Sequence, residues 1–286
     1  MNGLLNINKP KGMTSADVVH RVRRITGEKR VGHMGTLDPQ GTGVLLLGVG
    51  RGAKLFDAFL SKDKVYEADF TFGFTTDTLD GEGIVTDRTS VLPSRVQLEK
   101  ALPGLTGRLN QVPPRYSAKS VGGVRAYKLA REDRAFELSA AAVAVYEFSL
   151  LEERTADTWR FLIRCSSGTY VRSLCRDLAA SVGSLAAMTA INRLRAGSFS
   201  VSDSVGLDAL AADCRRYLIP LTEAVAAFPR YDAPAEKYEL LKNGVKLYTD
   251  AVIPASAAVY CRGELFGLGH TDAGRLVLTT RLHEAG

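Results

Sequence analysis

The clearest hydrophobic pattern near the start of the chain predicts an amphipathic helix. Apolar residues recur at helical spacing from Val18 to Ile25. Thr14 and Asp17, just before them, have the spacing of a capping box, and Gly27 follows the last apolar position, as is common at a helix end. We therefore expect a helix between these two signals, with a basic outer face.

Further along the chain, apolar runs and alternating patterns predict strands mixed with helices. The unbroken apolar run Val44–Val49 predicts a buried strand, and the clean alternation of Lys64–Phe72 predicts a half-buried one. Strands and helices do not alternate as regular βαβ units, so the pattern favours an α+β fold over a doubly wound sheet. The other expected elements are helices over Ala53–Leu60, Ser94–Leu105 and Tyr170–Val182 and strands over Val143–Leu151, Trp159–Cys165 and Ala196–Val201.

Two segments suggest how the chain is divided. The segment from about residue 107 to 135 carries prolines, basic groups and tyrosines, and we expect a long functional loop that leads into a helix. From Arg230 onward, short strand-like runs separated by turn residues predict a small β module. A length of 286 residues fits one large domain plus a small one, so we expect domains at 1–229 and 230–286.

Composition narrows the functional classes. Hydrophobic residues make up 45% of the chain and charged residues 24%, which indicates an ordered globular protein. No apolar stretch approaches the ~18 residues that cross a bilayer, and the first residues lack a signal-peptide pattern, so we expect a cytoplasmic protein with no membrane association. The formal charge of +6 and the basic residues within the first thirty positions favour a polyanionic partner. Neither a zinc site nor a disulfide framework is indicated by the scattered cysteines Cys165, Cys175, Cys214 and Cys261.

The segment Gly32–Gly43 (GHMGTLDPQGTG) places one carboxylate, Asp38, among glycines and a proline just before a buried strand. It could be a plain turn, since Asp-Pro between glycines is good turn chemistry. A phosphate cradle is a weaker interpretation, because the Lys-Ser/Thr end of a P-loop is missing. A dinucleotide site is weaker still, because the third of the glycines Gly48, Gly50 and Gly52 comes one place too early for GxGxxG and no βα repeats follow.

Several motifs occur in a fixed order along the chain: NKPKGMTS, HMGTLDPQGTGVL, KVYEA, PPRYSA, AYKLAR and SSGTYVRSL. In this set and order, the chain resembles the TruB-type tRNA pseudouridine synthases. The resemblance implies a mixed, mainly antiparallel central sheet flanked by helices, plus a small C-terminal PUA-like β module. It also implies isomerisation of the uridine at position 55, in the T-arm loop of tRNA, to pseudouridine. Such an isomerisation is redox-neutral, so we expect no cofactor and no metal, and we expect a monomer.

The resemblance also assigns the candidate catalytic residues. In the family, the aspartate of GHxGTLDPxxxG is the nucleophile, which corresponds to Asp38. Tyr66 matches the KxYxA tyrosine, whose ring stacks on the target uracil and whose hydroxyl is a candidate base for the C5 proton. Arg172 matches an arginine that the family pairs with the nucleophile, which would keep its pKa low. Without the resemblance, Tyr66 would be interpreted as a core tyrosine and Arg172 as a helix-surface arginine.

Four further residues correspond to family positions that bind substrate. Tyr170 resembles the tyrosine that lines the base pocket, and Ile191 occupies the place of an aliphatic pocket contact. His33 corresponds to a histidine that fills the space vacated by the flipped base. Lys9 matches the N-terminal lysine, to which we assign a structural role beside the active-site loop.

Two departures from the family pattern and three alternatives stay open. Ile191-Asn192-Arg193 replaces the usual Leu-Arg-Arg, and Lys119 comes one position earlier than usual, so some RNA contacts should differ. A non-catalytic RNA-binding or RNA-folding module would share the basic surface, and a dinucleotide-binding enzyme is a weaker alternative. A role in a ribonucleoprotein acting on ribosomal RNA is less favoured, because the chain lacks long basic tails. The sequence leaves open whether Asp38 attacks uracil C6 or ribose C1′.

Overall fold

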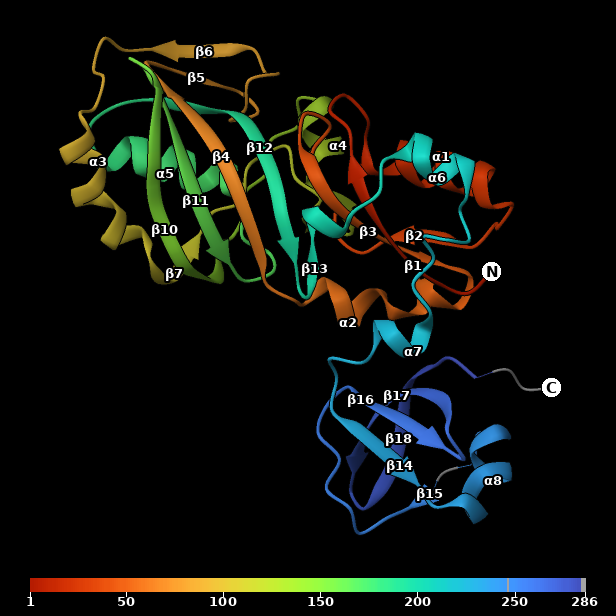
Figure 1. The fold of residues 1–286 in the computed structure, drawn as a ribbon. Coiled ribbons are helices and arrows are strands. Elements are labelled where there is room, and N and C mark those ends of the chain that lie inside the picture. Colours follow the sequence, from red (N-terminus) through yellow and green to blue (C-terminus); the bar gives the residue numbers. More distant parts are fainter. Residues whose placement is uncertain (246, 284–286) are drawn as a thin grey trace. The chain divides into compact units, whose positions relative to one another are not determined.

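The computed structural model describes residues 1–245 and 247–283, which fold into two compact units (Figure 1). Unit 1 comprises Met1–Asp38, Val44–Leu60 and the segment from Ser198 onward, and unit 2 comprises Pro39–Gly43 and Ser61–Gly197. The chain thus first leaves unit 1 directly after Asp38. Within the described residues, no helix combines the length and the apolar character needed to cross a membrane.

Unit 2 is built on a sheet with strand order β12-β4-β11-β10-β7, in which each neighbouring pair is antiparallel (Figure 1). Thr42 and Gly43, at the start of β3 (Thr42–Val49), add a parallel pairing with Asn192 and Arg193 of β12. The sheet is therefore mixed and mainly antiparallel, which confirms the predicted α+β fold class. The strands are β4 (Lys64–Phe72), β7 (Gly107–Gln111), β10 (Ala141–Thr155), β11 (Thr158–Cys165) and β12 (Ala186–Ala196).

Helices α3 (Arg95–Ala101) and α5 (Val171–Ser181) cover one face of this sheet (Figure 1). Every second residue of β4 is buried, as its alternating sequence predicts. The rings of Phe70, Phe148 and Phe161 cluster in the core with centroid distances of 4.8–6.2 Å. The smaller elements of unit 2 are β5 (Phe74–Thr76), β6 (Val85–Arg88), the 3₁₀ helix Leu102–Leu105, β8 (Ser120–Val121), β9 (Val124–Arg125) and α4 (Ala126–Arg131).

Unit 1 contains the predicted helix, α1 (Ser15–Thr26). The capping box is present: the Thr14 hydroxyl accepts from the Asp17 N–H, and the Asp17 carboxylate accepts from the Thr14 N–H. The Thr14 hydroxyl also donates to the Asp17 carboxylate, and this bond, together with the one from the Thr14 N–H, lowers the pKa of Asp17. The other elements of this part are β1 (Gly3–Lys9), β2 (Val31–His33), the 3₁₀ helix Gly50–Leu55, α2 (Phe56–Leu60), β13 (Phe199–Ser200), the 3₁₀ helix Val201–Asp203, α6 (Leu207–Ala212) and α7 (Leu221–Ala224).

The last part of unit 1 is a curled sheet with strand order β14-β16-β17-β18-β15, as expected for a PUA-like module. Its first strand begins at Arg230, and Phe266, Val259 and Leu276 lie in its core. The division of domains at residue 229 stays a prediction. The elements are β14 (Arg230–Ala233), the 3₁₀ helix Ala235–Lys237, α8 (Tyr238–Lys242), β15 (Leu247–Tyr248), β16 (Ala257–Cys261), β17 (Glu264–Asp272) and β18 (Arg275–Arg281).

One predicted strand was only partly right. The short strand β13 (Phe199–Ser200) lies inside the expected range Ala196–Val201, whereas most of the long strand β12 precedes that range. The sequence of β12, AAMTAINRLRA, does not alternate cleanly, because nearly all side chains on both of its faces are buried or half-buried. A strand of this kind carries no period-two signal, so the pattern placed it too late.

At Gly43 the backbone of β3 closely approaches that of β12. Its φ is +93°, and a Cβ there would lie 2.3 Å from the Arg193 carbonyl oxygen. Gly43→Ala should lower the free energy of unfolding by about 3 kcal/mol, since a backbone clash adds to a left-handed strain of roughly 1–2 kcal/mol. Gly183→Ala is the control for denaturant titration, because φ is +69° there but no atom lies within 4 Å of the added Cβ. Equal losses in the two variants would contradict the predicted clash.

Candidate active site

Asp38 lies in the loop between β2 and β3 and is partly exposed. The backbone just before it is fixed by Ser15, the first residue of α1. The buried Ser15 hydroxyl donates to the Leu37 carbonyl and accepts from the Leu37 N–H, both at 3.0 Å. Nearer β2, the Met34 N–H donates to the Leu46 carbonyl at 2.8 Å. Asp38 therefore lies in a loop whose position α1 and β3 restrict.

Lys9 and His33 also belong to unit 1. Lys9 is fully buried, and its ammonium donates to the carbonyls of Met13 at 2.6 Å and Pro10 at 2.9 Å. These bonds tie the end of β1 to the turn that leads into α1. His33 is the last residue of β2, lies opposite Leu47 and is half-buried. The predicted roles of both residues stay predictions.

Arg172 lies in the first turn of α5 and is buried, so it is not the helix-surface arginine that the local pattern alone would suggest. Its guanidinium pairs with the Asp80 carboxylate at 3.3 Å and donates to the carbonyls of Thr78 and Tyr116, both at 3.0 Å. Asp80 accepts in turn from the Thr78 hydroxyl and the Glu82 N–H. Within unit 2, these contacts fix the orientation of the Arg172 guanidinium.

Asp80 is a residue that the sequence analysis missed. It belongs to the segment TTDTLDGEG, whose polar and glycine-rich composition predicts only a loop. Asp80 is nevertheless buried, and it is 92 positions away from Arg172 in the sequence. No local pattern indicates which distant cation such an aspartate will meet.

Tyr170 precedes α5, and the buried Gln111 at the end of β7 holds its backbone. The Tyr170 N–H donates to the Gln111 side-chain oxygen at 2.8 Å, and the Gln111 amide donates to the Tyr170 carbonyl at 3.1 Å. One glutamine thus satisfies both backbone groups at a helix start that has no side-chain cap of its own. The ring of Tyr170 is half-exposed.

Tyr66 and Ile191 lie on neighbouring strands of the unit 2 sheet. Tyr66 on β4 is opposite Arg193 of β12, and Ile191 is opposite Ala68. Tyr66 and Ile191 are 8% and 7% exposed, so both belong to the buried face of the sheet. The Arg193 guanidinium carbon lies over the Tyr66 ring, 5.6 Å from its centroid. The structure therefore brings Tyr66, Ile191 and Arg193 together on one pair of strands.

The loop expected over residues 107–135 contains the hairpin β8–β9 and helix α4. Its start is fixed by the Val112 carbonyl, which accepts from the Ser173 hydroxyl and the Arg176 guanidinium of α5. The basic side chains of the loop are exposed, which suits a surface that meets a polyanion. They are Arg108, Arg115, Lys119, Arg125, Lys128, Arg131 and Arg134.

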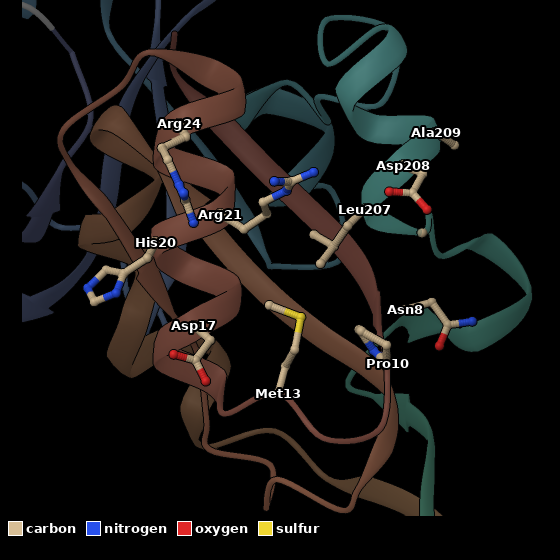
Figure 2. A pocket seen from close by; sticks show the side chains of 11 residues that line it. Asn8, Pro10, Met13, Asp17, His20, Arg21, Arg24, Leu207, Asp208 and Ala209 are labelled. Carbon is tan, nitrogen blue, oxygen red and sulfur yellow. The ribbon is translucent and has the colours of Figure 1, made fainter.

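A pocket of about 640 Å³, lined by both polar and apolar residues, lies beside α1 (Figure 2). Arg21 and Arg24 line it from α1, and Asp208 and Leu207 line it from α6. The neighbouring Arg23 does not line this pocket, because its guanidinium donates to the Val31 carbonyl at 2.9 Å. The structure thus divides the arginines of α1 into two that are available at the pocket and one that holds the helix to β2.

The described residues contain no cluster of three or more His, Cys, Asp or Glu side chains able to hold a metal ion. The four cysteines are free thiols. Burial raises the pKa of Cys165 to about 11 and the pKa of Cys175 well above its usual value. These two thiols are therefore neutral near pH 7 and are poor nucleophiles.

Comparison with known proteins gives consistent matches. The family model described as "TruB family pseudouridylate synthase (N terminal domain)" matches residues 23–171. Three proteins named tRNA pseudouridine synthase B are similar over most of their length. That of Clostridium novyi (strain NT) is 38% identical, covering 89% of this chain and 88% of that protein. That of Mycobacterium sp. (strain KMS) is 41% identical, covering 93% of this chain and 91% of that protein. That of Thermobifida fusca (strain YX) is 44% identical, covering 80% of each.

Solved structures show the same fold. An H/ACA RNP bound to a substrate RNA containing 2′-deoxyuridine has a TM-score of 0.76 at 20% identity, covering 99% of this chain and 86% of that one. A Cbf5-Nop10-Gar1 complex has a TM-score of 0.73 at 22% identity, covering 97% and 79%. At these identities the likeness concerns the fold alone. The family model and the relatives' identity over most of the chain show that this chain belongs to the TruB family of pseudouridylate synthases.

Proposed function

We propose that this chain isomerises the uridine at position 55, in the T-arm loop of tRNA, to pseudouridine, with Asp38 as the nucleophile. Its relatives are named for the modification of tRNA. The observation that carries the proposal is the loop that holds Asp38, where buried hydrogen bonds from Ser15 fix the backbone of the preceding residue and Asp38 itself is partly exposed. A nucleophile needs both properties, a fixed place and a path to the substrate.

The proposed chemistry is redox-neutral. A carboxylate oxygen of Asp38 forms a bond to uracil C6 or to ribose C1′, and the N1–C1′ glycosidic bond breaks. The base then turns, C5 bonds to C1′, the proton on C5 leaves and N1 gains a proton. A bond from Asp38 to C1′ breaks as C5 bonds to that carbon, whereas a bond from Asp38 to C6 breaks after C5 has bonded to C1′; either way the carboxylate is regenerated. The protein needs to supply only a nucleophile, a base and a closed site for a flipped nucleotide.

The other site residues take supporting roles in this proposal. Tyr66 stacks on the target uracil and removes the C5 proton, while Tyr170 and Ile191 line the base pocket. Arg172 supplies a positive charge that favours the ionised form of the nucleophile. His33 occupies the place that the flipped base leaves in the RNA loop. The burial of Tyr66, Ile191 and Arg172 supports these roles, because a flipped base needs a site from which water is excluded.

The proposed tRNA-binding surface includes the exposed basic groups of the 107–135 loop, the α1 pocket and the C-terminal module. Phosphate contacts of this kind release counterions, which makes binding dependent on salt. The monomeric state and the cytoplasmic location stay predictions from the sequence.

One assay tests the proposed function: the release of tritium from tRNA labelled at uracil C5. We expect the purified chain, without any added cofactor, to release label and to form pseudouridine in the T-arm loop. Tight RNA binding without release would favour a non-catalytic RNA-binding module. Activity that required a nicotinamide or a flavin would favour the dinucleotide-binding alternative.

The division of the α1 arginines gives a specific prediction. Arg21→Gln with Arg24→Gln should weaken tRNA binding about tenfold at physiological salt. The slope of log Kd against log salt should fall by the amount that about two phosphate contacts contribute. The chemical step in single turnover should stay near normal. The matched control changes two exposed basic residues of α3, Arg95→Gln with Lys100→Gln, and should leave Kd within about twofold. Equal losses from the two pairs would show that the α1 pocket is not a preferred phosphate site.

A further inference from the structure

The buried face of the sheet around β4 is apolar at one end and holds charged side chains at the other. Phe70 and Phe72 lie in an apolar core, whereas the other end of the same face holds two buried cations, Lys64 and Arg193. Tyr66 lies between these two ends on β4. Lys64 is 6% exposed and Arg193 is 3% exposed, and burying two like charges side by side is costly. The buried face near Tyr66 therefore carries two cationic side chains.

Strand pairing places Arg193 at the Tyr66 ring. The two residues are directly opposite in the antiparallel pair β4–β12, and the guanidinium carbon lies over the ring, 5.6 Å from its centroid. A register shift follows Arg193, so Arg195, only two positions later, is exposed instead of sharing its face. The sheet is thus shaped so that Arg193 points inward at Tyr66.

We infer that Arg193 is a positioning residue that acts through Tyr66: its cation stabilises the phenolate form of Tyr66 and thereby prepares it as the base for the C5 proton. This inference rests on the proposed function, which assigns Tyr66 that task. A cation over an aromatic ring attracts the electron density of that ring, and the attraction increases when the ring becomes an anion and both groups are desolvated. With Arg193 on one face of the ring, the other face is the one on which a flipped uracil can stack.

The step that this arrangement serves is the loss of the C5 proton after C5 has bonded to C1′. The phenolate oxygen of Tyr66 takes the proton, and the electron pair of the C5–H bond stays in the ring as the C5–C6 double bond re-forms. N1 carries a proton at the end of the reaction, and the phenol later returns its own proton to solvent. No oxidant, reductant or further reactant is needed.

Other charged or titratable groups of unit 2 belong to β4 and to the elements packed against it. On the buried face lie Lys64 of β4 and the thiol of Cys165 of β11, and Arg172 comes from α5, which packs on β4 and β12. Glu67 and Asp69 alternate onto the opposite face of β4. Burial and the nearby Arg193 lower the pKa of Lys64 to about 8, so near pH 7 Lys64 is mostly a second cation, and it loses its charge above pH 8. Loss of Arg193 would raise the pKa of Lys64, so Lys64 would keep its charge to higher pH and partly compensate for the lost cation.

The test is the pH profile of the single-turnover rate of pseudouridine formation. Arg193→Met keeps most of the length and the packing of the side chain but removes its charge. We expect the acidic limb of the profile to move to higher pH by about one unit. The rate of the variant should then be about tenfold below that of the parent chain at pH 7 and should come within about threefold of it at high pH. Arg193→Lys should return the limb toward that of the parent chain, and the exposed Arg195→Met should leave it unchanged.

A double-mutant comparison tests whether Arg193 acts through Tyr66. In a Tyr66→Phe background, Arg193→Met should change the remaining rate by less than about twofold, because the residue through which it acts is gone. A rate that falls equally at every pH would overturn the inference and indicate a structural role. A weaker tRNA Kd with an unmoved limb would also overturn it, in favour of a phosphate contact. Should Arg193→Met fail to fold, Arg193→Gln replaces it with the same expectations.

These outcomes are separate from failure of the proposed function. If the parent chain forms no pseudouridine, the proposed function fails. If the parent is active and Arg193→Met gives a parallel profile, the inference alone fails. If Tyr66→Phe is fully active, Tyr66 is not the base and the inference falls, while the assignment of the reaction stands.

Discussion

Asp38→Asn should bind tRNA with near-normal affinity and form no detectable pseudouridine. The substitution conserves the size of the side chain but removes its negative charge and its nucleophilic oxygen, and covalent catalysis cannot proceed through a neutral amide. The fold should survive, because Asn is as good a turn residue as Asp and the position is partly exposed. The anchoring bonds from Ser15 reach the backbone of Leu37 and do not involve the Asp38 side chain.

Three measurements on purified Asp38→Asn check this result: thermal unfolding, tRNA binding, and tritium release in single turnover. The matched control is Asp57→Asn, the same chemical change at an exposed aspartate of α2, which should keep full activity. If Asp38 were only a turn residue, Asn would support catalysis. Pseudouridine formation by Asp38→Asn at the parent rate would therefore refute the assignment of the nucleophile.

Tyr66→Phe should bind tRNA but turn over slower by a factor on the order of 10² or more. The phenyl ring keeps the stacking surface, whereas the loss of the hydroxyl removes the proposed base, and a positioned base contributes roughly 10²–10⁴-fold. Because Tyr66 is 8% exposed and lies on the buried face of β4, the apolar replacement should leave the fold intact. Single-turnover kinetics on labelled tRNA measures the effect.

Two comparisons sharpen the test of Tyr66. Tyr146→Phe removes a hydroxyl from an exposed tyrosine of β10 and should leave the rate unchanged. Tyr66→Leu removes the ring as well, so it should be slower than Tyr66→Phe. Normal turnover by Tyr66→Phe together with loss in Tyr66→Leu would reduce Tyr66 to a stacking surface and would remove the base from the proposed mechanism.

Much of the local structure could be predicted because the signals lie between neighbours in sequence. The capping box at Thr14 and the alternation of β4 both appear as expected. Two of the failures in strand prediction share a cause. Strand β1 was not predicted and β12 was placed too late, and in both strands the sequence lacks the alternation of a half-buried strand. Burial of residues on both faces removes that signal.

The candidate site, like the fold, was only partly predictable from the sequence. The segment with Asp38 could be located from its own residues, and the family resemblance supplied the roles expected of Tyr66 and Arg172. The partners of these side chains could not be found in the sequence. Arg172 pairs with Asp80, 92 positions away, and Gln111 holds Tyr170 from 59 positions away. Arg21, Arg23 and Arg24 look alike in sequence, yet only Arg23 bonds back to Val31.

The sequence by itself determined helix α1 and its cap, the α+β class, the basic character of the chain and the motif that carries Asp38. Each of these depends on interactions between residues close in the chain, or on composition. The tertiary structure decided that Ser15 fixes the residue before Asp38, that Asp80 orients Arg172, and that Arg193 lies over the Tyr66 ring. The physical reason is that a buried polar or charged group must find a partner or pay for desolvation, and the partner is chosen by the topology and register of the strands, which bring distant residues together.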